Sequence, residues 1–247
     1  MKRRIVLLLT MLIALGVAAF MPVNAEAAGK VKLNKTKVLL EVGQQYQLNV
    51  KNTTKKVKWS TSDKKTAQVS STGVITAKKV GAAKITAKVN GKKYTCKVTV
   101  VDYTGMSNEQ KDVVSYALKY VGNKYQYGGS SLTKGTDCSG FTMAVYKKFG
   151  YNLVHNAYKQ LKTTKSVKMK NIRPGDLIFY GSSKRNCSHV ALYIGNGKVV
   201  HASTEKTGIT ISDYNYRKYV GVGRVLKKET YPEQIEDDSV TRTAQSK

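Results

Sequence analysis

The sequence predicts two folded domains of different class, an all-β sandwich over residues 30–101 and an α+β domain over residues 108–228, joined by a linker at 102–107. A chain of 247 residues has room for two domains of ordinary size. Over residues 30–101 apolar and polar side chains alternate with a period of two, as in strands that bury one face. Residues 107–149 instead repeat apolar side chains at helical spacing, and the alternation returns after residue 176.

The two ends of the chain differ from both domains. Lys2-Arg3-Arg4, an apolar run at 5–20 and small residues ending at Ala25 have the layout of a secretory signal, which predicts export and removal of residues 1–25. A permanent membrane anchor is the alternative, but the run is shorter than the ~20 residues that a spanning helix needs. Residues 229–247 are polar without an apolar period, so we expect a disordered tail.

Runs of alternating side chains mark the strands of the first domain. Several short strands separated by turn residues such as Gly43, Gly73 and Asn90-Gly91 are typical of a β-sandwich or barrel. The domain has a single cysteine, Cys96, so a disulfide between its sheets is excluded. We expect Cys96 to be a buried thiol in the last strand. No catalytic group of residues lies here, so the domain is interpreted as a spacer or binding module. The runs cover residues 38–42, 46–50, 57–59, 83–87 and 94–100.

In the second domain the expected helices precede the expected strands, which is the order of an α+β domain. Ser107 and Gln110 have the spacing of a capping box, so a helix should begin there. A second helix should run from about Cys138 to Phe149, and a third should lie around residues 157–162. Strands are expected at residues 177–180, 190–194, 199–203, 209–211 and 220–225.

The segment Asp137-Cys138-Ser139-Gly140-Phe141 carries the candidate nucleophile. It opens a predicted helix directly after the glycine-rich loop 127–130. A thiol in the first turn lies at the positive end of the helix dipole, which favours the thiolate. Such sites lower the cysteine pKa from ~8.5 to about 3.5–7.5. Cys138 is therefore expected to be a nucleophile that needs a base.

The candidate bases are His189 and His201, which flank the turn 195–197. A two-residue turn at Asn196-Gly197 would put the two histidines on opposite faces of the hairpin. A three-residue loop with a left-handed Gly197 would make them diagonal neighbours on one face, with Cβ atoms roughly 7–8 Å apart. We predict the three-residue loop, and with it a set of Cys138 as nucleophile, His189 as base and His201 as the residue that orients the base.

Each domain contains a set of motifs in a fixed order. Those of the first domain are Leu33-Asn34-Lys35-Thr36, Val42-Gly43, Trp59-Ser60-Thr61-Ser62-Asp63, Gly73-Val74-Ile75-Thr76-Ala77 and Gly81-Ala82-Ala83-Lys84-Ile85-Thr86-Ala87. With these motifs, residues 30–101 resemble the group-two bacterial Ig-like domains. Those of the second domain are Tyr125-Gln126-Tyr127-Gly128-Gly129, Asp137-Cys138-Ser139-Gly140-Phe141, Arg173-Pro174-Gly175-Asp176-Leu177, His189-Val190-Ala191-Leu192-Tyr193-Ile194-Gly195 and Val200-His201-Ala202. With this second set of motifs, residues from about 108 to 226 resemble the NlpC-type cell-wall cysteine peptidases, which are papain-like enzymes that cut peptidoglycan stem peptides.

The second resemblance implies a reaction and further site residues. It implies Cys138, His189 and His201 as the catalytic residues, with hydrolysis of the amide between the side-chain carboxyl of D-glutamate and the third stem residue. It also implies Tyr125 as a substrate or oxyanion contact, and Asp137 and Ser139 against the substrate peptide. No metal or cofactor is required, and the enzyme would be secreted and associated with the cell wall. Ala191 stands where the family often has Gly.

The same residues allow other interpretations. Cys138, Cys187, His189 and His201 are suitable zinc ligands, but their spacing fits none of the usual paired patterns. His155 has no motif partner and is expected to be structural, and Cys187 is expected in the loop from Ser182 without a role. A non-enzymatic wall-binding or adhesion protein, or a cysteine amidase or acyltransferase acting on another substrate, remains the alternative.

The net charge of +28 predicts an anionic partner. Residues 26–104 contain 17 Lys and Arg against 4 Asp and Glu, and residues 105–247 contain 23 against 11, so the surplus covers both domains. No nucleic-acid motif accompanies it, and export argues against such a partner. We therefore expect anionic wall polymers as partners, beside the peptidoglycan stem peptides that the resemblance implies, and a monomer. A basic surface that serves only solubility is the alternative interpretation of the charge.

Overall fold

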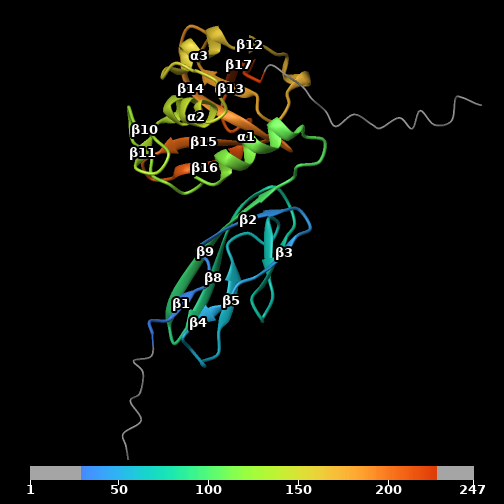
Figure 1. The fold of residues 1–247 in the computed structure, drawn as a ribbon, viewed down its shortest axis with the longest axis vertical. Coiled ribbons are helices and arrows are strands. Elements are labelled where there is room, and N and C mark those ends of the chain that lie inside the picture. Colours follow the sequence, from blue (N-terminus) through green and yellow to red (C-terminus); the bar gives the residue numbers. More distant parts are fainter. Residues whose placement is uncertain (1–28, 227–247) are drawn as a thin grey trace, which may run out of the picture. The chain divides into compact units, whose positions relative to one another are not determined.

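The computed structural model describes residues 29–226 (Figure 1). The expected signal segment at 1–25 and the expected tail at 229–247 lie outside the described residues. Within the described part, none of the helices is both long enough and apolar enough to cross a membrane.

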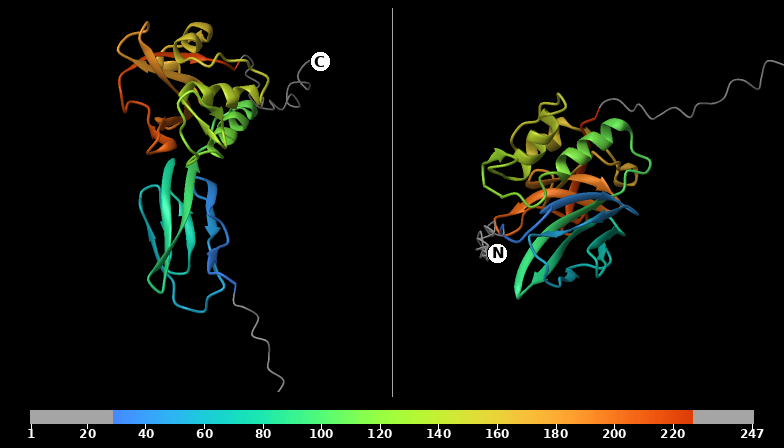
Figure 2. Two further views of the ribbon diagram at one scale, coloured as in Figure 1. Left: turned by 90° about the vertical axis from the view of Figure 1, so that its left-hand side faces the viewer. Right: turned by 60° about the horizontal axis from the view of Figure 1, so that its bottom comes forward.

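The first domain contains two sheets that share one apolar core, with most strands running along the length of the domain (Figure 2). The larger sheet has the order β2-β9-β8-β5 and the smaller has the order β3-β7-β6, with β1 and β4 as a separate pair. Strands β2 and β9 are parallel and the other pairs are antiparallel. The strands are β1 Lys32–Leu33, β2 Lys37–Glu41, β3 Gln45–Gln47, β4 Val50–Lys51, β5 Lys58–Thr61, β6 Ala67–Val69, β7 Val74–Ala77, β8 Gly81–Val89 and β9 Lys92–Val101.

The burial of side chains along the strands of this domain alternates with a period of two residues. Alternate residues of β8, among them Ile85 and Ala87, enter the core, while the residues between them face outward. Cys96 of β9 is a fully buried free thiol, as expected, and burial raises its pKa to about 11. The β8–β9 hairpin turns at Asn90-Gly91, where both residues have positive φ, as a type I′ turn requires.

The second domain contains a six-stranded sheet of order β12-β17-β13-β14-β15-β16. All its pairs are antiparallel. Its strands are β12 Lys165–Ser166, β13 Leu177–Gly181, β14 Cys187–Gly195, β15 Lys198–Thr204, β16 Gly208–Asp213 and β17 Tyr219–Arg224, and β10 Ser130–Ser131 pairs separately with β11 Gly135–Thr136. The helices are α1 Asn108–Leu118, α2 Cys138–Lys147 and α3 Ala157–Thr163, with a 3-10 turn at Met169–Asn171.

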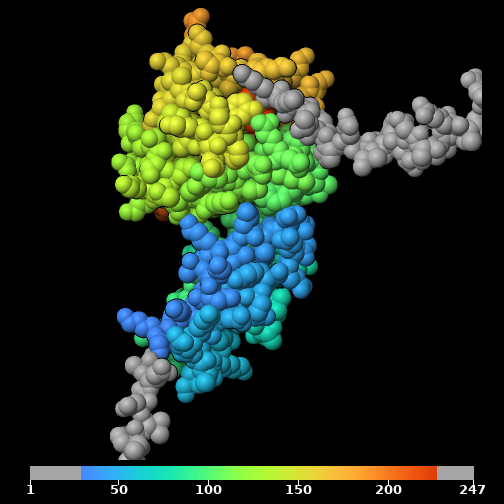
Figure 3. Space-filling view, in the orientation of Figure 1, coloured from blue at the N-terminus to red at the C-terminus, as the bar shows by residue number. Residues whose placement is uncertain are grey.

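Helices cover one face of this sheet. The main core joins apolar residues of α1 and α2 to those of β13, β14 and β15, and α3 also contacts β14. On the face shown in Figure 3, the surface of this domain is formed mainly by its first half, coloured green to yellow. The opposite face of the sheet has a smaller core that includes Ile178, Tyr180 and Ala191. The start of α2 therefore packs against the face of the sheet that the helices cover.

The turn between β14 and β15 differs from the expected one. Gly195 pairs with Lys198, which leaves only Asn196 and Gly197 in the turn, both with positive φ. The predicted three-residue loop is therefore wrong. The register shifts between Tyr193 and Gly195, because Ile194 is an extra residue on β14.

This bulge has the same effect on the register as the expected loop. Beyond it, Leu192 pairs with Val200, so that His201 stands next to Ala191 rather than Leu192. The two histidines consequently approach each other on one face of the hairpin, as predicted, although a bulge and not a longer loop is responsible.

Candidate active site

Cys138 is the first residue of α2, and Asp137 caps that helix. The Asp137 Oδ1 atom accepts a hydrogen bond from the Gly140 N–H at 2.7 Å. Burial raises the pKa of the Cys138 thiol, and backbone N–H groups of Val190 and Ser139 that donate to the sulfur offset part of this effect. The expected lowering of this pKa at the helix start is therefore wrong. The thiol is desolvated and stays protonated until a base removes its proton.

His189 of β14 is the base that the site offers. Its Nε2 atom lies 2.8 Å from Nδ1 of His201, and its side chain lines the same cavity as Cys138. Burial, the neighbouring His201 and the positive charge of Arg217 lower the pKa of His189 to about 3. At neutral pH the imidazole is therefore uncharged, with a lone pair on one nitrogen that can take a proton.

His201 of β15 is fully buried and connects His189 to β16. Its Nε2 atom lies 3.0 Å from Oγ of Ser212. Burial and the charge of Arg217 lower the pKa of His201 to about 4, so this ring is also neutral. The chain of contacts thus runs from His189 through His201 to the hydroxyl of Ser212.

Only one arrangement of the hydrogens along His189, His201 and Ser212 leaves His189 able to act as a base. If His201 donates from Nε2 to Ser212, its Nδ1 accepts from the His189 Nε2–H, and His189 Nδ1 keeps its lone pair. If the Ser212 hydroxyl donates instead, every proton moves by one position, and His189 Nδ1 carries a hydrogen that prevents it from accepting another. The hydrogen bond between His201 and Ser212 is therefore linked to the tautomer of His189, and donation from His201 to Ser212 accompanies the competent one.

Aromatic rings enclose the two histidines. The Tyr180 ring lies 5.9 Å from the ring of His189, and the Tyr216 ring lies 4.9 Å from that of His201. The Tyr216 hydroxyl is 3.3 Å from His201 Nδ1, and Arg217 lies over the Tyr216 ring at 5.4 Å. Burial raises the pKa of Tyr216 to about 12. These rings contribute to the burial of the histidine pair.

Ser212, Tyr216 and Arg217 are site residues that could not be identified from the sequence alone. The strand expected at 209–211 stopped one residue before Ser212, whereas β16 extends to Asp213. A strand two residues longer would have placed Ser212 on the face of His201. Tyr216 and Arg217 follow in the connection to β17, and no motif marks them.

Cys138 and His189 line one cavity of about 410 Å³. Tyr125, Asp137 and Ser139 also line it, as expected of residues that contact a substrate. The remaining lining residues are Tyr127, Gly128, His155, Asn156, Ala157, Cys187 and Ser188. His201 does not line the cavity and reaches it only through His189.

Asp137 is occupied by contacts within the protein. Oδ1 also accepts from the Ser139 hydroxyl at 3.1 Å and lies 2.8 Å from His155 Nε2, and Oδ2 accepts from the Gly128 N–H at 3.1 Å. The carboxylate thus fastens the glycine-rich loop and His155 to the start of α2. His155, expected to be structural and without a motif partner, pairs with Asp137 and lines the cavity.

Cys187 is also placed differently from the expectation. It is the first residue of β14, not part of the preceding loop, and its side chain lines the cavity with Cys138. Burial raises its pKa, and the nearby Cys138 contributes to this shift. Within residues 29–226, no three His, Cys, Asp or Glu side chains are arranged to hold a metal ion.

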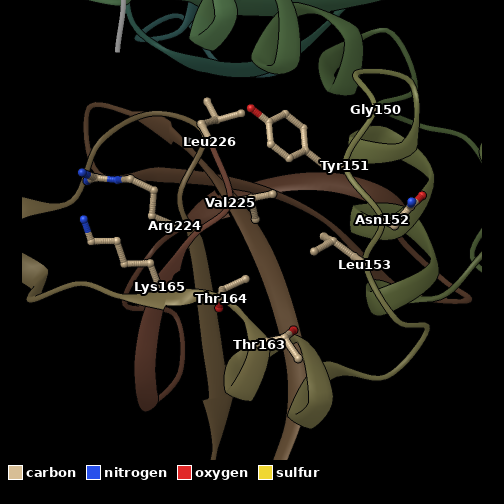
Figure 4. Close-up of a pocket in the computed structure, with 10 residues that line it drawn as sticks. All are labelled: Gly150, Tyr151, Asn152, Leu153, Thr163, Thr164, Lys165, Arg224, Val225 and Leu226. Atoms are coloured by element: carbon tan, nitrogen blue, oxygen red, sulfur yellow. The ribbon is translucent and has the colours of Figure 1, made fainter. Parts of the chain in front are cut away.

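A second and larger cavity, of about 880 Å³, lies between residues 150–153, 163–165 and 224–226 (Figure 4). It contains neither a cysteine nor a histidine, and its Arg224 binds Asp176 at 2.8 Å. Of these two cavities, only the smaller one is therefore lined by both a nucleophile and a base.

Comparison with known proteins identifies both domains. Residues 122–225 match the model of the NlpC/P60 family, and residues 27–100 match that of the bacterial Ig-like domain (group 2). This chain contains an NlpC/P60 domain preceded by a group 2 bacterial Ig-like domain. The NlpC/P60 model spans the whole set of Cys138, His189 and His201.

Curated relatives and a solved structure are similar to this chain. The murein DD-endopeptidase MepS/murein LD-carboxypeptidase of Escherichia coli K12 is 41% identical over 114 residues, covering 43% of this chain and 58% of that protein. The gamma-D-glutamyl-L-lysine dipeptidyl-peptidase of Bacillus subtilis is 32% identical over 149 residues, covering 58% and 49%. The chain thus spans about half the length of these relatives. The crystal structure of the NlpC/p60 domain of the peptidoglycan hydrolase SagA is 28% identical, with a TM-score of 0.43, and covers 46% of this chain and 97% of that one.

Proposed function

We propose that this protein is a secreted cysteine endopeptidase that hydrolyses the bond between the γ-carboxyl of D-glutamate and the diamino acid of peptidoglycan stem peptides. The observation that supports it is a thiol at the start of α2 and a neutral histidine of β14 in one cavity, with the second nitrogen of that histidine bonded to His201. The relative named gamma-D-glutamyl-L-lysine dipeptidyl-peptidase supports the substrate class.

The reaction begins with proton transfer from Cys138 to His189. Because burial raises the pKa of the thiol and lowers that of the imidazole, both groups are neutral at rest. The proton therefore moves to His189 Nδ1 as the sulfur attacks the substrate carbonyl. The backbone N–H of Cys138 faces the developing oxyanion. His201 accepts from the His189 Nε2–H and stabilises the imidazolium that forms.

The second half of the reaction returns the enzyme to its starting state. The His189 imidazolium protonates the leaving amine, and an acyl-enzyme thioester with Cys138 remains. His189 then takes a proton from water, the resulting hydroxide attacks the thioester, and the sulfur leaves and recovers its proton. No step of this sequence calls for a metal ion or an organic cofactor.

A digest of purified peptidoglycan tests this proposal. The wild type should release fragments that end at D-glutamate, identified by mass spectrometry, and Cys138→Ala should release none. Cys187→Ala is the matched control, because it removes a second thiol from the same cavity and should preserve the products.

Two outcomes would contradict the proposal. Identical digests from the wild type and Cys138→Ala would favour a wall-binding protein without enzymatic activity. Release of fragments cut only at the cross-links between stem peptides would support the cysteine mechanism but show that the enzyme cleaves a different bond.

A further inference from the structure

The outer face of the four-stranded sheet of the Ig-like domain carries lysines that stand opposite one another on neighbouring strands. Lys58 of β5 pairs with Lys88 of β8, which pairs with Lys93 of β9. Four residues further along, Lys84 of β8 pairs with Lys97 of β9. We call Lys58, Lys84, Lys88 and Lys93, all exposed, the lysine face.

Hydroxyl side chains lie between these lysines. Ser60, Thr86 and Thr95 pair across β5, β8 and β9 and point to the same side as the lysines, since they alternate with the core residues. Neighbouring strands are ~4.8 Å apart, and four residues of a strand span roughly 13 Å. The lysine face is therefore a flat array of ammonium groups and hydroxyl donors about one to two nanometres across.

This array lacks compensating negative charge. Strands β5, β8 and β9 contain no Asp or Glu, and in the part of the chain that the structure describes none of the four lysines pairs with a carboxylate. Like charges directly opposite each other on a sheet destabilise it. The pKa of Lys97 reflects this repulsion, because burial together with the charges of Lys37 and Lys84 lowers it. A partner with negative charge would remove this repulsion.

We propose that the lysine face binds a linear phosphodiester polymer of the kind found in cell walls. Ammonium groups and hydroxyls are suitable donors to phosphate oxygens, and a flexible polymer with repeated charges can follow a flat array. Single-stranded nucleic acid is less favoured, since such sites stack bases on aromatic rings and Trp59 and Tyr94 pack on the core side. A membrane surface is less favoured, because β5, β8 and β9 carry no large apolar side chain among the outward-facing lysines, and the exposed Leu39 stands apart on the edge strand β2.

The test compares two variants that lose the same charge in the same domain. The face variant changes Lys58, Lys84, Lys88 and Lys93 to Gln. The turn variant changes to Gln four exposed lysines that lie outside the sheets, namely Lys64, Lys65, Lys78 and Lys79. Each is titrated with purified poly(glycerol phosphate) in the full chain, and the catalytic variant Cys138→Ala is titrated in parallel to separate binding from hydrolysis.

The face variant should bind roughly tenfold or more weakly than the wild type, while the turn variant should stay within about threefold. Binding by the wild type should fall steeply with added salt, and Cys138→Ala should bind as the wild type does. Replacing the same four face residues by Arg keeps the charge and should retain binding. Thermal melts of the face variant should show unchanged or greater stability, because repulsion is removed.

Three outcomes would overturn the proposal. Equal loss in the face and turn variants would mean that net charge alone is responsible. No measurable binding of poly(glycerol phosphate) by the wild type at low salt would exclude the polymer. Tighter binding to single-stranded DNA or to phosphatidylglycerol vesicles than to poly(glycerol phosphate) would assign the face to a different partner.

Discussion

His189 Nε2 and His201 Nδ1 are 2.8 Å apart, and this contact leaves only Nδ1 of His189 for the thiol of Cys138. When two neutral imidazoles form such a contact, one ring must donate the hydrogen and the other must accept it. His201 therefore does more than hold a ring in place, because its protonation pattern decides whether His189 can act as a base. The two histidines come from adjacent strands, β14 and β15, whose register is set by the bulge at Ile194.

Replacing His201 should separate these contributions. His201→Ala removes the acceptor for the His189 Nε2–H, and kcat should fall by about 100-fold or more, as when a triad member that orients the base is lost. His201→Gln keeps an acceptor oxygen and should retain more activity than the alanine variant. Steady-state kinetics on a soluble stem peptide measure both. Equal and small losses would show that His201 has only a packing role.

Ser212 is expected to act through His201 on the tautomer of His189. Ser212→Ala removes the acceptor for the His201 Nε2–H, and kcat should fall by roughly tenfold while KM changes little, because substrate contacts are untouched. Ser212→Thr retains the hydroxyl and is the matched control, with activity near that of the wild type. If both variants lose activity equally, the hydroxyl is not the relevant group.

Stability should depend on pH through the two buried histidines. Burial lowers the pKa of His189 to about 3 and that of His201 to about 4, below the ordinary value of 6.5. Between these values the unfolded chain binds more protons than the folded one, so stability is complete above pH 6.5 and is lost as the pH falls toward 4. The loss approaches about 1.4 kcal/mol for each pH unit and each histidine.

Thermal unfolding between pH 7.5 and 4.5 tests this dependence. The Tm of the wild type should fall with acid, and the double variant His189→Gln/His201→Gln should show a flatter profile over the same interval. His155→Gln is the control, because it removes the third histidine of the chain without touching the buried pair. An equally steep profile in the double variant would assign the acid sensitivity to other groups.

Helix starts were predictable from the sequence because their causes are local. The Ser107 hydroxyl accepts from the Gln110 N–H and the Gln110 side chain accepts from the Ser107 N–H, as the capping-box spacing predicts. Cys138 likewise begins α2 directly after the capping carboxylate of Asp137. In each case the atoms involved are separated by three residues, so the sequence order alone brings them together.

The bulge at Ile194 was not predictable because distant segments stabilise it. The Tyr193 N–H donates to the Asp176 carbonyl at 2.8 Å, and the Tyr193 carbonyl accepts from the Gly175 N–H at 2.8 Å. These bonds fix β14 against the start of β13, and no pattern within the hairpin encodes them. Ser212 was missed for a related reason, since its contact with His201 depends on the pairing of β15 with β16.

Gly140 should resist substitution although it lies in a helix. Replacing glycine by alanine within a helix ordinarily stabilises it by about 1 kcal/mol. A Cβ at Gly140, however, would lie 2.2 Å from the backbone carbonyl oxygen of Gly129 and 2.9 Å from His155 Nε2. Gly140→Ala should therefore lower stability and also lower kcat, because the glycine-rich loop would have to move away from Cys138.

Gly150→Ala is the matched control for this last prediction. Gly150 lies just beyond the same helix with a φ of +81°, and an added Cβ there meets nothing within 4 Å. Its cost should be about 1 kcal/mol of backbone strain, with kcat unchanged. Chemical denaturation and steady-state kinetics on both variants give the comparison. If Gly140→Ala raised stability and kept full activity, the close approach of the loop to α2 would not be needed to hold Cys138 in place.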